Sequence, residues 1–149
     1  MRCIILNMKK NFLFVVFTVL TVVVGIVSIA TNADLFIFGN VESTTYINLI
    51  FSLAFAVCLI GLSVTKKKIV LLYVFLIPSI CCLLAAVFRM FNLSAEVLII
   101  PIVMFSAPLS GISLITGHYD CIFYFLTTVI YAIPAVIQIL PLKKSDKDN

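Results

Sequence analysis

Five apolar runs dominate this chain of 149 residues and constrain its fold more than any other feature. They occupy residues 12–30, 47–64, 69–88, 97–115 and 122–140. A helix needs roughly 17–25 apolar residues to cross the hydrocarbon core of a bilayer, and each run has that length. Because lipid offers no partner to backbone N–H and C=O groups, such runs must be helical. The sequence therefore predicts an all-α polytopic membrane helix bundle, with residues 1–149 forming a single integral membrane domain.

Composition supports the same class and excludes a soluble one. Hydrophobic residues make up 64% of the chain and charged residues only 11%, whereas soluble domains have roughly 45–50% and about 25%. The net charge of +4 could suggest a nucleic-acid partner. The basic residues lie in short patches beside the apolar runs, however, and that distribution is typical of membrane orientation. We expect a lipid bilayer around the chain and no bound nucleic acid.

A short lysine turn, Thr65 to Lys68, joins the second and third runs. It is too short for any arrangement except an antiparallel helical hairpin. Cytoplasmic loops of membrane proteins carry an excess of Lys and Arg, so this turn and the basic N-terminus are predicted to be cytoplasmic. The residues that determine this topology are Lys9, Lys10, Lys66, Lys67, Lys68, Lys143 and Lys144.

The fourth apolar run, residues 97–115, is the least regular. Proline, serine and glycine interrupt it at Pro101, Ser106, Pro108, Ser110 and Gly111. If all five runs cross, the basic tail 142–149 lies outside, where positive charge is disfavoured. If this run enters and returns to the same side, the tail is cytoplasmic and only Arg89 among the basic residues is external. We favour four full transmembrane helices plus one broken, re-entrant segment, with a kinked fifth span as the alternative.

The first apolar run also has two interpretations. A start at Met8, followed by two lysines and small residues near Ala30 or Ala33, has the form of a secretory signal peptide. The apolar core of a signal peptide is typically about 7–15 residues long, whereas the run 12–30 is longer and suits a span. We therefore expect an uncleaved first helix.

The four-span topology places four ionisable residues at the external boundary of the membrane: Arg89, Glu96, His118 and Asp120. A histidine beside a carboxylate can relay protons or hold a metal. The simpler interpretation is a loop histidine, a helix-capping Asp120, a first-turn Glu96 and an Arg89 that extends to the headgroups. One histidine with scattered acids is an incomplete metal or catalytic set, and the cysteines match no zinc pattern. We expect no metal and no cofactor.

The broken segment 101–111 could present a serine or unwound backbone carbonyls inside the bilayer, as broken helices of transporters and channels do. Close helix packing through small residues is the simpler interpretation, and the pair Ser52 and Ala56 fits it as well. Two further features need partners within the bundle. Pro78 should kink the third span, and the hydroxyl of Tyr131, in the middle of the last span, needs an acceptor.

Catalysis has little support, because the chain contains no Gly-rich phosphate loop, no H-E-x-x-H and no G-x-S-x-G motif. The basic start, lysine hairpin and basic tail are typical of small multi-span proteins of bacterial inner membranes. We expect a non-enzymatic accessory component that binds another membrane protein or itself. The alternative is a small oligomeric transporter or channel whose segment 101–111 lines the path. An enzyme using His118 and Asp120 ranks last.

Overall fold

The computed structural model describes residues 2–32, 45–65, 68–91, 93, 99–117 and 120–140. Within these ranges the chain is almost entirely helical and contains no strand. Four long helices dominate: α1 (Arg2–Thr31), α3 (Tyr46–Thr65), α4 (Ile69–Met90) and α7 (Asp120–Ile139). Each contains a stretch long and apolar enough to cross a membrane. The four predicted full spans are confirmed, with boundaries within two residues of those expected, except at the start of α1.

Helix α1 begins ten residues before its predicted apolar run. Its membrane-spanning part is Asn11–Thr31, and the helix continues without a break through the basic leader to Arg2. Lipid requires helix within the bilayer, but nothing ends the helix where the apolar run ends, because residues 2–10 contain neither proline nor glycine. Lys9 and Lys10 therefore lie on α1 itself, next to its spanning part.

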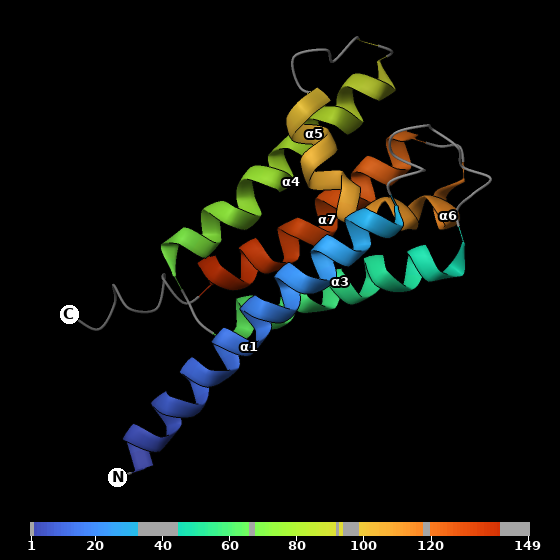
Figure 1. Cartoon of the computed structure of the whole chain (residues 1–149). Coiled ribbons are helices and arrows are strands. Elements are labelled where there is room, and N and C mark those ends of the chain that lie inside the picture. The colour runs from blue at the N-terminus through green and yellow to red at the C-terminus, as the bar shows by residue number, and fades with distance from the viewer. Residues whose placement is uncertain are drawn as a thin grey trace.

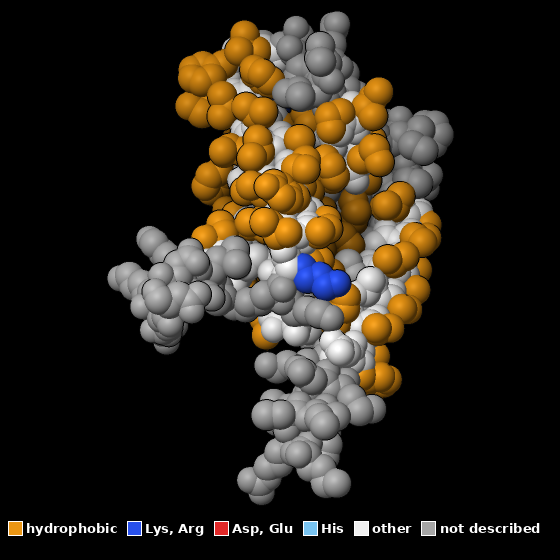
Figure 2. Space-filling model, turned by 90° about the vertical axis from the view of Figure 1, so that its left-hand side faces the viewer, with side chains coloured by type: hydrophobic (Ala, Val, Ile, Leu, Met, Phe, Trp, Pro, Cys, Tyr) orange, Lys and Arg blue, Asp and Glu red, His pale blue; other side chains and the backbone are white. Residues whose placement is uncertain are grey.

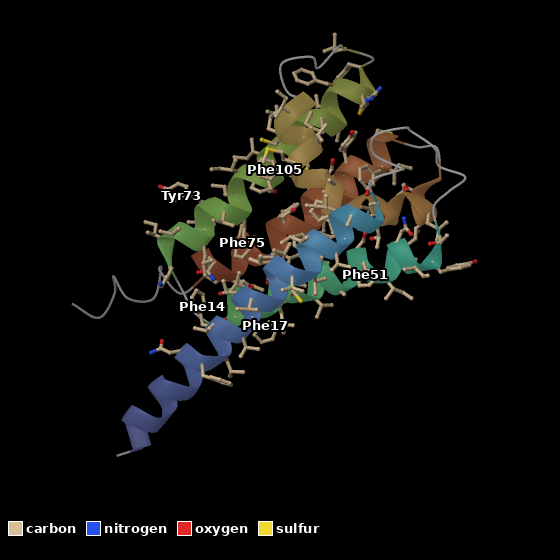
Figure 3. The ribbon with its side chains drawn as sticks, viewed as in Figure 1. Phe14, Phe17, Phe51, Tyr73, Phe75 and Phe105 are labelled. Carbon is tan, nitrogen blue, oxygen red and sulfur yellow. The ribbon has the colours of Figure 1, made fainter. Side chains whose placement is uncertain are left out.

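The four long helices form two antiparallel pairs (Figure 1). Helix α1 packs on α3, where Gly61 lies directly against the Phe17 ring. Helix α4 packs on α7, and the Ser79 hydroxyl of α4 donates to the backbone oxygen of Thr128 at 3.3 Å. This bond links α4 to α7 beside Pro78. The Ser79 hydroxyl is therefore paired with the backbone of the neighbouring helix and not with that of its own helix. Figure 3 shows Phe75 of α4 within the bundle and Tyr73 of the same helix pointing away.

An apolar core joins the two pairs. Its fully or nearly fully buried members include Phe55, Leu59, Leu62, Phe75, Leu109, Ile112 and Tyr131. The Tyr131 hydroxyl donates to the backbone oxygen of Phe105 at 2.9 Å, so this mid-span tyrosine has the internal partner that the sequence requires. On the outside, hydrophobic side chains cover most of the described part of one face (Figure 2), as contact with lipid demands.

The fourth apolar run is a broken helix and not a span. It consists of α5 (Ile99–Ser106), the 3₁₀ helix η3 (Ala107–Ile112) and the single turn α6 (Ser113–Thr116). Pro108 has no N–H and its ring clashes with the carbonyl four residues earlier, so the α-helix ends there. Helix α5 starts beside the end of α4, and α6 ends near the start of α7 (Figure 1). The segment therefore enters the bundle and returns to the same end, which makes it re-entrant.

The opposite end of the bundle carries the lysine turn. There the Gln138 side chain of α7 accepts the Lys68 N–H at 3.1 Å and donates to the Ser63 backbone oxygen at 2.8 Å. The Lys68 ammonium lies 5.2 Å from the centre of the Phe14 ring on α1. The beginning of the spanning part of α1 and the end of α7 therefore lie at the same end of the bundle, as four crossings require.

This arrangement predicts that the two termini lie on the same side of the membrane. Reporters active only in the cytoplasm, fused before Met1 and after Asn149, should both give signal, because the lysine end favours the cytoplasm. The same reporter inserted after Gly39, in the connection between α1 and α3, should be silent. Opposite signals from the two termini would contradict four crossings.

Candidate functional site

Buried polar side chains gather where the broken segment meets α1 and α3. The buried serines and asparagines on these elements, apart from Ser63 near the lysine end of α3, are Ser28, Asn32, Asn48, Ser52, Ser106 and Ser110. Polar groups are costly to bury without hydrogen bonds, so each needs a partner within the protein. These contacts define the candidate site, which we call the junction: Ser28 and Asn32 of α1 and the turn after it, Asn48 and Ser52 of α3, and Pro108 to Gly111 of η3.

Helix α1 holds the broken segment through Ser28. Its hydroxyl donates to the Pro108 backbone oxygen at 2.6 Å and accepts from the Asn32 amide nitrogen at 3.2 Å. Ser28 and Asn32 are four residues apart, so they share one face of the helix and the turn that follows it. The end of α1 therefore presents a hydroxyl and an amide to the unwound turn.

Helix α3 holds the same segment through Ser52. Its oxygen accepts the Gly111 N–H at 3.1 Å and the Asn32 amide nitrogen at 3.4 Å. Asn48, one turn earlier, donates to the Thr31 backbone oxygen at 2.9 Å, and its own oxygen accepts from the Thr45 hydroxyl at 2.7 Å. Both polar ends of the Asn48 side chain are thus paired, and they tie the start of α3 to the end of α1.

Gly111 is required by the close approach of η3 to α3. A Cβ atom at this position would collide with the Asn48 backbone oxygen and would lie 2.7 Å from the Ser52 oxygen. Only glycine allows this backbone-to-backbone contact. The glycine noted in the sequence as a helix breaker therefore acts here as the contact point of the re-entrant segment.

The Asn32 side-chain oxygen, Oδ1, is the exception to this pairing. The residue has no exposed surface, and Oδ1 has no hydrogen-bond partner among the described residues. An unpaired buried acceptor costs about 1–3 kcal/mol. Such groups in native proteins call for an explanation, and binding of a ligand is one.

The chemistry available at the junction is that of neutral oxygen atoms. Among the described residues, every buried polar side chain is serine, threonine, asparagine or glutamine. Such groups can coordinate a cation or hydrogen-bond a polar solute, but they supply no general acid or base. The described part of the chain also holds no group of three His, Cys, Asp or Glu side chains suited to a metal.

Of the predicted broken-segment residues, the structure places Pro108, Ser110 and Gly111 at the junction. Ser106 and Ser110 are buried, but their hydroxyls bond the backbone of their own segment. The Ser106 hydroxyl donates to the Ile102 backbone oxygen at 2.6 Å, and the Ser110 hydroxyl donates to the Ala107 backbone oxygen at 2.8 Å. The contacts to α1 and α3 come from the backbone of Pro108 and Gly111. Pro101 is partly buried on α5, away from these contacts.

The predicted polar cluster is described only in part. The Arg89 side chain is exposed in the last turn of α4, and Asp120 begins α7, so both lie at the end of the bundle where the broken segment enters. Glu96 and His118 lie outside the described residues, and the Asp120 side chain is likewise not described. Their role as a functional set stays a prediction.

Among the topology determinants, the side chain of Lys68 is described; it is exposed and lies over Phe14. Lys9 and Lys10 belong to α1. The remaining four lie outside the described residues: Lys66, Lys67, Lys143 and Lys144.

The sequence prediction did not include the residues of α1 and α3 that form the junction. Ser28, Asn32 and Asn48 are not among the predicted site residues, and Ser52 is predicted only as a small packing residue. A usable signal was present. Two polar pairs at four-residue spacing, Ser28 with Asn32 and Asn48 with Ser52, end one apolar run and begin the next. Antiparallel packing of these runs brings such pairs together.

Comparison with known proteins adds no assignment: the chain matches no protein-family model, no curated protein and no solved structure.

Proposed function

We propose that this protein is a non-enzymatic, multi-pass membrane protein that binds a small polar solute or ion at the junction and passes it across the membrane. The observation that carries this proposal is the unpaired, fully buried Asn32 Oδ1 beside the unwound turn at Pro108 to Gly111. A purely structural contact would have no need of an acceptor that stays unpaired.

The position of the 3₁₀ helix η3 within the bundle supports this role. Irregular backbone at membrane depth is tolerated only where protein buries it or where it lines a cavity. Transporters and channels use such broken helices to aim backbone groups at their ligands. Here the turn meets hydroxyl and amide groups from two spans, which gives one small region several oxygen ligands.

The described state is closed on the lysine side of the junction. Leu59 and Leu62 of α3, Phe75 of α4 and Tyr131 of α7 fill the core in that direction. A solute bound at the junction cannot continue through this packing. Passage therefore requires a rearrangement of the helices, or a path formed between copies, as in a small oligomeric transporter.

We infer that both termini are cytoplasmic and that the membrane is a bacterial inner membrane.

A second candidate function is the accessory role, in which α1 binds another membrane protein. Only 11% of the spanning part of α1 is buried, against 39% for each of the other three spans. However, the small residues Ser52 and Ala56, which such binding could use, are buried inside the bundle. Large apolar side chains such as Val15, Val22 and Ile26 form the exposed face of α1 instead, and these suit lipid equally well.

Solute entry into proteoliposomes tests the proposed function. Stopped-flow light scattering should show faster entry of at least one solute from a panel of alkali chlorides, amino acids and polyols, compared with empty liposomes. Asn32→Leu should lower that rate at least tenfold, because it removes the amide from the junction. Ser63→Ala is the matched control, since this buried serine bonds its own helix at 2.7 Å near the lysine end.

Equal rates in protein-containing and empty liposomes for every solute would overturn transport. A second membrane protein that co-purifies in mild detergent would then favour the accessory role.

A further inference from the structure

The Asn32 amide lies among oxygen atoms of three elements: its nitrogen faces the serine oxygens, and its own oxygen, Oδ1, has no partner among the described residues. The Asn32 amide nitrogen lies 3.2 Å from the Ser28 oxygen and 3.4 Å from the Ser52 oxygen. The Ser28 oxygen in turn lies 2.6 Å from the Pro108 backbone oxygen. The Asn48 backbone oxygen borders the same turn, since it blocks any side chain at Gly111. The amide oxygen therefore sits in a buried region rich in acceptors.

We propose that the junction binds a monovalent alkali cation, with Asn32 Oδ1 as a ligand and neighbouring hydroxyl and backbone oxygens completing the site. This inference rests on the proposed function in naming the class of ligand that the junction takes. It also requires a cation site in the free protein, which can be measured without any transport.

The charge of the ligand follows from the pairing of the donors. Three of the junction donors are paired: the Ser28 hydroxyl with the Pro108 oxygen, the Gly111 N–H with the Ser52 oxygen, and the Asn32 amide nitrogen with the Ser28 and Ser52 oxygens. An anion would need free donors, whereas a cation needs free acceptors. Two buried side-chain atoms lack a partner among the described residues, Asn32 Oδ1 and Ser113 Oγ. Both can accept, and the Asn32 oxygen can only accept, so a cation suits them.

Among the described residues, the buried polar side chains include no acid group, and this decides between one charge and two. Ca²⁺ and Mg²⁺ sites rely on carboxylates, and every described buried polar side chain is neutral. Neutral oxygens cannot offset the cost of burying a doubly charged ion. Backbone carbonyls of broken helices coordinate Na⁺ in transporters. The Pro108 carbonyl of the 3₁₀ helix η3, which accepts the Ser28 hydroxyl at 2.6 Å, is such a group.

A bound cation also explains the orientation of the amide. The oxygen and nitrogen of an asparagine are assigned from their hydrogen bonds. Turning the Asn32 amide by half a rotation would bring its oxygen to Ser28 and Ser52 and leave the NH₂ group unpaired instead. Either orientation leaves one buried atom without a partner, and a cation removes the cost only in the described orientation.

Equilibrium binding of ²²Na⁺ to the purified full-length chain in detergent tests the proposal. The wild type should bind one Na⁺ per chain, and unlabelled Na⁺ or K⁺, but not choline, should displace the label. Asn32→Leu should weaken binding at least tenfold. Asn32→Asp should bind at least as tightly as the wild type, because it keeps the oxygen and adds a negative charge. Ser63→Ala should leave binding unchanged.

Folding is controlled by a second measurement. The thermal midpoint of the wild type should be higher in NaCl than in choline chloride at equal ionic strength, since a ligand of the folded state stabilises it. That difference should disappear in Asn32→Leu and persist in Ser63→Ala.

No saturable ²²Na⁺ binding in the wild type, with equal thermal midpoints in the two salts, would overturn the cation site and leave an ordered water as the partner of Asn32. Binding that is unchanged in Asn32→Leu would overturn the assigned location. Na⁺ binding without entry of any solute into liposomes would instead retain the site and refute transport. Solute entry without cation binding would refute the site alone.

Discussion

Replacing Gly111 with alanine is expected to destabilise the protein by about 1–3 kcal/mol, and replacement with leucine by more. The added Cβ meets the Asn48 backbone oxygen and lies 2.7 Å from the Ser52 oxygen. Backbone atoms in a packed helix cannot move aside as a side-chain end can. Helix η3 must therefore withdraw from α3, which breaks the Gly111 to Ser52 hydrogen bond.

The measurement is the thermal midpoint, or the free energy of unfolding in mixed detergent micelles, for Gly111→Ala. Gly61→Ala is the comparison. Its Cβ would collide with the Phe17 ring, but a ring can rotate, so the loss of stability should be smaller. Both variants should still insert, because the spans remain apolar and insertion precedes helix packing. Equal stability of Gly111→Ala and the wild type would show that η3 does not dock on α3 as described.

Replacing Gln138 with leucine is expected to cost about 2–6 kcal/mol, which is the sum for two unsatisfied groups. The side chain is almost fully buried and bonds two helix ends at once. It accepts the N–H of Lys68, the residue before α4, and donates to the Ser63 oxygen in the last turn of α3. Groups at helix ends have no partner within their own helix, so leucine leaves both without one.

The unfolding measurement used for Gly111→Ala applies here, with Thr127→Val as the matched control. Thr127 is fully buried on the same helix, but its hydroxyl bonds only the Phe123 oxygen of α7 at 2.9 Å. Valine keeps its shape and should cost less than about 1 kcal/mol, the net worth of a typical hydrogen bond. If Gln138→Leu is no more destabilising than Thr127→Val, Gln138 does not hold the lysine end together.

The spans could be predicted from the sequence because membrane insertion depends on a local property. About 20 consecutive apolar residues suffice for a span, so α3, α4 and α7 agree with the predicted boundaries to within two residues. The interruption at Pro108 is equally local, since a proline inside an α-helix removes a backbone donor and kinks or breaks the helix at that point. Helix α1 extends further because helix formation outside the bilayer depends on propensity and not on hydropathy.

The junction could be predicted only in part. The prolines and Gly111 indicate where the chain is irregular, but not what surrounds it. Asn32, Asn48 and Ser52 each appear in the sequence as single polar residues in or beside apolar runs. Their common role depends on contacts between positions far apart, such as Ser28 with Pro108, which are separated by 80 residues.

The sequence by itself determined the helical class, the four regular apolar spans and the break in the fourth apolar run. These follow from hydrophobicity and from proline, whose effects act within a single segment. The tertiary structure decided that the broken segment is re-entrant, that Gly111 touches α3 and that Asn32 Oδ1 is buried without a partner. Those outcomes depend on how closely α1, α3 and η3 pack, because packing distances and hydrogen-bond pairing between distant segments are not encoded in any one of them.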